Sequence, residues 1–88
     1  MNANRRKEIA LIIKRFNALS EIATSIQEDI IAVCDEEEGY LANIPENLQE
    51  SENYQNAEAA IEALASAAEE LENLDLEAAI ASLEEASA

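Results

Sequence analysis

The sequence predicts an all-α protein, a helix–loop–helix hairpin that packs into an oligomeric bundle. Alanine and glutamate, both good helix formers, supply 18 and 17 of the 88 residues. Apolar residues recur at alternating spacings of three and four in two long segments, and the single glycine and single proline fall between those segments. A chain of this length forms one domain, residues 1–88, whose small core favours self-association.

The first predicted helix spans residues 4–36 and is amphipathic along its length. Asn4 is a suitable residue to cap its start. The apolar residues of this helix occupy an unbroken series of a and d heptad positions, namely Ile9, Ile12, Phe16, Leu19, Ala23, Ile26, Ile30 and Val33. Ile13 and Ile22 widen this apolar face, which leaves room for more than one neighbouring helix.

Residues 37–52 are predicted to form the loop of the hairpin. Gly39 suits the left-handed conformation that ends many helices, and Pro45 prevents a helix from continuing through it. Pro45 can also begin a short helical turn through Gln49. The apolar and aromatic residues in and beside this loop either close the end of the hairpin or form a patch for a partner; they are Tyr40, Leu41, Ile44 and Tyr54.

The second half of the chain predicts two further helices, at residues 53–72 and 76–87. The first of them keeps the heptad spacing with small residues at half of its seam positions, so it can approach a neighbour closely. Asn73 or Asp75 can cap the last helix. The sequence leaves open whether these two segments form one kinked helix.

Charge is distributed very unevenly along the chain, whose net charge is −15. All five basic residues lie at the start, where they form a basic end and a candidate anion site: Arg5, Arg6, Lys7, Lys14 and Arg15. Residues 16–88 contain 19 acidic residues and no base. The candidate acidic sites for a partner are a run at the end of the first predicted helix and a stripe along the second, namely Glu36, Glu37, Glu38, Glu58, Glu62, Glu69 and Glu72.

Two arrangements neutralise the basic end, and the sequence does not choose between them. In a hairpin that places Val33 near Ala57 and Ile26 near Leu64, Arg5 and Arg6 lie beside Glu84 and Glu85, and Arg15 lies near Asp75. Alternatively, two copies of the first helix pair antiparallel around residues 21–22, so that Arg5, Arg6 and Lys7 of one copy meet Glu36, Glu37 and Glu38 of the other.

Several classes of chemistry are not expected. The chain has no histidine and a single cysteine, Cys34, so Cys–His catalysis and zinc sites that depend on these residues are excluded. The adjacent acids 35–38 lack the spacing of a calcium loop. We therefore expect no enzyme activity, catalytic residue, metal or cofactor, and we expect Cys34 to be a buried or half-buried thiol. No leader or membrane-spanning run is recognised, which predicts a cytoplasmic protein with no membrane partner.

Residues 35–61 carry a recognisable order of an acidic run, Tyr40, the segment Asn-Ile-Pro-Glu-Asn-Leu-Gln at 43–49, Ser51-Glu52 and Tyr54. This order resembles a motif in small helical proteins of bacteriophages and mobile elements. The resemblance covers roughly residues 30–65. It implies a helix–loop–helix unit and a phage or mobile-element setting, and it assigns no site residue.

The leading functional expectation is a non-enzymatic interaction protein that binds itself and a basic protein surface. In its most concrete form it mimics DNA and inhibits a host defence or nucleic-acid enzyme, because its acids can approximate the charges of a phosphate backbone. Direct nucleic-acid binding is not expected of so acidic a chain. The alternatives are a structural coiled-coil-like assembly module and an oligomer that sequesters a small anion, such as a nucleotide, at its basic ends.

Overall fold

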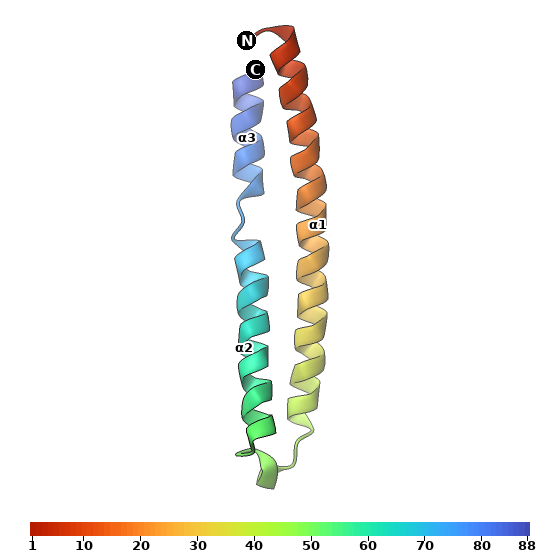
Figure 1. Cartoon of the computed structure of the whole chain (residues 1–88), viewed down its shortest axis with the longest axis vertical. Helices are drawn as coiled ribbons and strands as arrows, with labels where there is room; N and C mark the ends of the chain where they lie inside the picture. The colour runs from red at the N-terminus through yellow and green to blue at the C-terminus, as the bar shows by residue number, and fades with distance from the viewer.

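The chain folds as a long helical hairpin in a computed structural model that describes all residues, 1–88. Helix α1 (Ala3–Ala42) is followed by a short 3-10 helix, η1 (Glu46–Leu48), and then by α2 (Glu52–Glu72) and α3 (Leu76–Ser87). Figure 1 shows α2 and α3 running one after the other alongside α1, so that both termini lie at the same end. The hairpin measures 70 × 15 × 13 Å and contains no strand. This confirms the predicted all-α hairpin.

Helix α1 is longer than the sequence predicts at both ends. Asn2 caps its start in place of Asn4, because the Asn2 Oδ1 accepts a hydrogen bond from the backbone N–H of Arg5 at 2.9 Å. At the other end, Gly39 lies inside the helix with a negative φ and does not end it. The helix continues to Ala42 and Asn43 follows as its C-cap, shortly before Pro45.

The loop forms the short helical turn predicted after Pro45. The backbone carbonyl of Pro45 accepts from the N–H of Leu48 at 2.9 Å, which closes the single turn of η1. Ser51 then caps α2, and its Oγ accepts from the N–H of Tyr54 at 3.2 Å. These local bonds turn the chain back within residues 43–51.

The segments 53–72 and 76–87 form two separate helices, which answers the question that the sequence leaves open. Asn73 is the C-cap of α2. Asp75 caps α3, and its Oδ1 accepts from the N–H of Ala78 at 3.0 Å. The interruption is therefore specified by capping residues and needs neither glycine nor proline.

The two arms of the hairpin are held in register by polar contacts. Gln27 Nε2 donates to the backbone oxygen of Ala68 at 3.1 Å, and the Cys34 thiol lies 3.8 Å from the backbone oxygen of Ile61. The predicted register is wrong, because it would place Gln27 opposite Ala63. The cause is the extension of α1 to Ala42: since α2 still begins at Glu52, the turn is shorter and its centre lies later in the chain. Ala68 therefore faces Gln27 rather than Ile22.

The face of α1 that packs on the other arm also differs from the predicted one. Its buried and half-buried residues alternate in spacing between four and three, and they are Ile9, Ile13, Phe16, Ser20, Ala23, Gln27, Ile30, Cys34, Glu37 and Leu41. Half of the predicted seam is therefore correct, while Ile12, Leu19, Ile26 and Val33 remain exposed. The core is thin, since Cys34, Ala57 and Ala68 are the buried residues of the chain.

Candidate functional site

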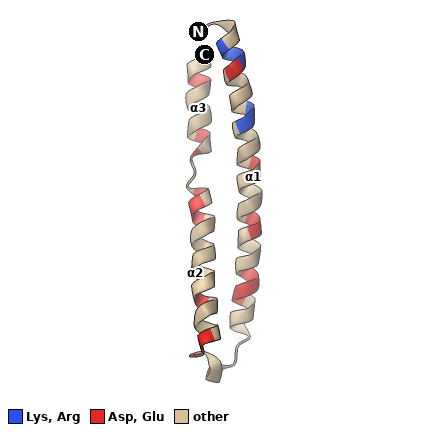
Figure 2. Cartoon of the chain, viewed as in Figure 1, with Lys and Arg blue, Asp and Glu red and all other residues tan.

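The arm formed by α2 and α3 presents an acidic surface along the whole hairpin. Figure 2 shows acidic residues along both helices of this arm, and basic residues only near the start of α1. The predicted stripe on α2 lies on this surface, where its four members are exposed: Glu58, Glu62, Glu69 and Glu72. A basic side chain approaching this arm meets no competing base after Arg15.

The acidic run 35–38 lies within α1 rather than at its end. Glu36 and Glu38 are exposed, whereas Glu37 is half-buried on the side that faces α2. Glu37 borders a shallow hollow of about 350 Å³ together with Asn53 and Asn56. The structure therefore divides the run between an outer surface and the interface of the two arms, and the run does not act as one charge cluster.

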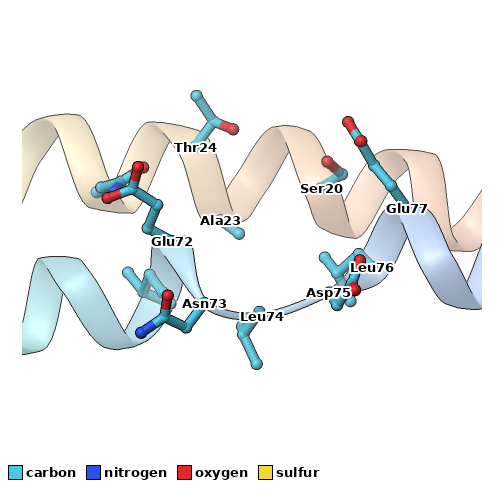
Figure 3. Close-up of a pocket in the computed structure, with 11 residues that line it drawn as sticks. Ser20, Ala23, Thr24, Glu72, Asn73, Leu74, Asp75, Leu76 and Glu77 are labelled. Carbon is cyan, nitrogen blue, oxygen red and sulfur yellow. The ribbon is translucent and has the colours of Figure 1, made fainter.

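A pocket of about 480 Å³ lies where the α2–α3 break faces α1 (Figure 3). Small and polar residues of α1, among them Ser20, Ala23 and Thr24, form one wall of this pocket. The opposite wall is the segment 72–77, in which Leu74 points away from α1 and is 53% exposed. Because the facing residues of α1 are small and Leu74 points away, the break leaves a larger space than the hollow of about 340 Å³ beside Cys34 and Leu64.

The chemistry of this pocket suits a cationic group. Glu72 and Glu77 lie towards its two ends, and Asp75, already engaged as the cap of α3, adds a third carboxylate (Figure 3). The hydroxyl group of Ser20, which is half-buried, can accept a further hydrogen bond from an ammonium or guanidinium. Sequence reasoning missed this pocket. The available signal was the interruption at residues 73–75, but locating its partner residues on α1 required the correct register.

The basic end is fully presented to solvent in the single chain. Its five side chains are exposed, and none of the hydrogen bonds of the structure is made by a lysine or arginine side chain. The predicted proximity of Arg15 to Asp75 is wrong, since Asp75 shares the central pocket with Ser20. Arg15 instead borders a hollow of about 280 Å³ with Ile12, Phe16 and Leu19. The bases therefore lie together at one end without being neutralised by close contacts.

The predicted loop patch divides into two parts. Tyr40 and Leu41 belong to α1, and Tyr54 belongs to α2, so only Ile44 lies in the loop. Leu41 and Tyr54 are half-buried, as expected of residues that close the end of the hairpin. Tyr40 is 52% exposed and borders a hollow of about 280 Å³ with Ile44 and Pro45, as expected of residues that can meet a partner.

Cys34 is a structural thiol within the interface of α1 and α2. Its sulfur lies 3.8 Å from the backbone oxygen of Ile61 and 3.9 Å from Glu38 Oε1. Burial raises the pKa of this thiol above its ordinary value of 9.0, and the carboxylates of Glu38 and Asp35 raise it further. The thiol is therefore protonated at neutral pH, a state that is unsuited to nucleophilic chemistry.

No group of three or more His, Cys, Asp or Glu side chains is arranged to hold a metal ion. None of the helices combines the length with the apolar character needed to cross a bilayer. Comparisons with protein-family models, with curated proteins and with solved structures find no match for this chain. Functional inference therefore depends on the surfaces of the hairpin itself.

Proposed function

We propose that this chain is a non-enzymatic interaction protein that binds a basic protein surface through its acidic α2–α3 arm. One observation carries the proposal: the glutamates of this arm are exposed along a 70 Å hairpin whose bases are confined to the first 15 residues. Opposite charge steers association and suppresses wrong partners, which is the role we assign to this surface. The pocket between Glu72 and Glu77 would receive one lysine or arginine of that partner.

A host nucleic-acid enzyme is the first class of partner to consider, because such enzymes carry basic channels. The resemblance of residues 35–61 to phage and mobile-element proteins supports a setting in which a host enzyme is the target. The net charge of −15 over 70 Å corresponds to roughly one charge per 5 Å. This charge density is lower than that of a single DNA strand, which carries one charge per about 3.4 Å, and lower still than that of a duplex. One copy of the chain therefore imitates a single strand more closely than a duplex.

A competition experiment tests this proposal. The chain should displace a fluorescent oligonucleotide from a nuclease recovered with it from host lysate, and the displacement should weaken as salt increases because the contacts are electrostatic. The variant Glu62→Lys/Glu69→Lys should lose at least about tenfold in affinity, as expected when close charge pairs become repulsive.

The matched control is Glu8→Lys/Glu21→Lys, which makes the same change in net charge at exposed positions of α1, outside the acidic arm. This control should retain most of the affinity. Equal losses in both variants would mean that only total charge matters, and an absence of salt-dependent displacement would refute binding through the acidic arm.

A structural or assembly role is the second candidate, and a specific observation favours it. Large apolar side chains remain exposed on α1, among them Leu19, Ile22 and Ile26 at 48%, 57% and 45%. Extended apolar patches of this kind mark interaction sites. An assembly module would form a concentration-dependent oligomer and show no affinity for a host enzyme.

A further inference from the structure

The exposed large apolar side chains of the chain are concentrated on one helix. Eight of the eleven belong to α1, and none belongs to α2 or α3. The eight residues are Leu11, Ile12, Leu19, Ile22, Ile26, Ile31, Val33 and Tyr40. Apart from Leu74 in the break, the acidic arm therefore presents small, polar or charged residues outwards, whereas α1 carries an apolar surface in addition to the face that packs on α2 and α3.

Six of these eight residues form a second heptad stripe on α1. Ile12, Leu19, Ile26, Val33 and Tyr40 recur every seven residues, immediately beside the face that packs on the other arm. Ile22 lies between Leu19 and Ile26 at spacings of three and four, which is the pattern of a helix–helix seam. We call this set of six residues the α1 stripe. A helix with two adjacent seams can contact two neighbours at once, and the hairpin supplies only one of them.

The charges that flank the α1 stripe are self-complementary in an antiparallel pair. Bases at 5–7 and 14–15 are mirrored about the middle of the helix by acids at 36–38 and 28–29. When a second copy of α1 runs in the opposite direction, each of the five bases therefore lies at the level of an acid of the other copy, although Glu37 itself is turned towards α2. Glu8 lies at the level of Asp35, so that pair alone has like charges. A parallel pair would instead place every charge beside its own copy.

We propose that the α1 stripe binds the α1 stripe of a second copy in an antiparallel arrangement with twofold symmetry. Leu19 of each copy packs near Ile22 of the other at the centre, and Arg15 of each lies near Glu28 and Asp29 of the other. A twofold interface uses the same patch on both copies, which the mirrored charges of one helix allow. The exposed bases, unpaired within their own chain, gain partners in this way.

The size of the α1 stripe is consistent with a weak dimer. From Ile12 to Tyr40 the helix is about 42 Å long at 1.5 Å per residue, and it is about 10 Å wide. Covering this strip buries on the order of 400 Å² on each copy, so the total of about 800 Å² falls below the roughly 1,200–2,000 Å² of stable interfaces and in the range of weak, transient ones. We therefore expect the dimer to dissociate at micromolar concentrations. At higher concentrations we expect a bundle of two hairpins, with four long arms.

Sedimentation equilibrium between 1 and 500 µM tests this inference, which is independent of the proposed binding of a basic partner. The wild-type chain should change from monomer to dimer within this range. Leu19→Glu/Ile26→Glu should remain monomeric, with its helix content unchanged by circular dichroism because both side chains are exposed in the single hairpin. The control is Ala18→Glu/Ser25→Glu, which adds the same charge at exposed positions one residue before Leu19 and Ile26, outside the α1 stripe. This control should still dimerise.

Charge exchange tests the orientation. Arg15→Glu should weaken the dimer several-fold, and Arg15→Glu/Glu28→Arg should restore it, because residues 15 and 28 face each other, again with opposite signs, only when the helices are antiparallel. In a Cys34→Ala chain, a cysteine at position 22 should form a disulfide between copies, whereas one at position 6 should not.

A monomer throughout the concentration range would overturn the proposal. Cross-linking at position 6 as readily as at position 22, or failure of the double charge exchange to restore the dimer, would overturn the antiparallel arrangement. Loss of dimerisation with retained binding to a basic partner would refute this inference alone and leave the proposed function standing. Dimerisation without any binding to a basic partner would refute the proposed function and leave this inference standing.

Discussion

Cys34 shows how a polar side chain can be accommodated in the thin interface between the two arms. Only Cys34, Ala57 and Ala68 are buried, so the helices approach each other closely where their side chains are small. The thiol reaches the backbone oxygen of Ile61, and Gln27 reaches that of Ala68 one heptad earlier along α1. These two contacts hold the register of the arms, because a displaced α2 would offer different carbonyl groups.

The raised pKa of Cys34 predicts a loss of stability in alkaline solution. The folded-state pKa lies above the unfolded value of about 9, so the protonated thiol stabilises the fold fully below pH 9. This contribution is lost as the pH rises through the folded-state pKa, because the unfolded chain releases its proton first. Urea midpoints of the wild-type chain should therefore fall between pH 8.5 and pH 10.5 by more than those of Cys34→Ala.

The thiol itself supplies an independent check of the same shift. At pH 8 the native chain should react with a disulfide reagent more slowly than the urea-unfolded chain, because only the thiolate reacts and the native thiol has the higher pKa. An exposed cysteine at position 18 of a Cys34→Ala chain is the control and should react equally fast in both states. Parallel loss of stability in wild type and Cys34→Ala would show that Cys34 contributes nothing to the pH dependence.

At the scale of elements, the continuation of α1 through Gly39 can be tested directly. Gly39 has a negative φ, and a Cβ added there meets no atom within 4 Å. Gly39→Ala should therefore raise the free energy of unfolding by about 0.5–1 kcal/mol, because alanine loses less backbone entropy in a helix. Urea denaturation at fixed protein concentration measures the change.

Ala32→Gly provides the matched reverse substitution, since Ala32 is exposed on the same face of α1 one heptad earlier. It should lower the free energy of unfolding by a similar amount. If Gly39→Ala instead destabilised the chain, Gly39 would adopt the left-handed conformation that the sequence predicts, and α1 would end near residue 38.

The sequence predicts the helices well because their signals are local. Alternating apolar spacing, Asp75 as a cap and Pro45 before a short turn all act within a few residues, and the structure has each of them. Gly39 misleads because a single glycine inside a helix costs only about 1 kcal/mol, which 40 residues of continuous helix easily offset. The error in register follows from that one residue.

The choice of packing face could not be predicted, because two heptad stripes on α1 share the same central residues. Ile9, Phe16, Ala23 and Ile30 belong to both, and the sequence favours the more apolar companions Ile12, Leu19, Ile26 and Val33. The structure packs α2 and α3 on the companions Ile13, Ser20, Gln27 and Cys34. From this face, Gln27 and Cys34 reach backbone carbonyl groups of α2. These contacts depend on the register of the two arms, which the pattern of apolar residues does not specify. The pocket at the α2–α3 break was missed for the same reason.

At the scale of the whole molecule, both shape and charge limit the stability of a single hairpin. A rod of 70 × 15 × 13 Å with three buried residues has little apolar burial to hold its arms together. Its 20 acidic residues repel one another across the hairpin, and the five bases, grouped at one end, offset little of that repulsion. Pairing of two copies through α1 would add apolar burial and would place the bases against acids.

This balance predicts that salt stabilises the fold, in contrast to a protein held by ion pairs. At 10 mM salt the Debye length is about 30 Å, so the acids of both arms repel one another, whereas at 0.5 M it is only a few ångströms. The thermal midpoint, followed by circular dichroism at one protein concentration, should rise by roughly 5–10 °C over this range, equivalent to about 1–2 kcal/mol. Glu62→Gln/Glu69→Gln should raise the midpoint at low salt and have less effect at high salt, because the removed charges are exposed and already screened there. A midpoint that fell with salt would show instead that attractive ion pairs outweigh the repulsion. The basic end of α1 would then contribute more to stability than its exposed side chains indicate.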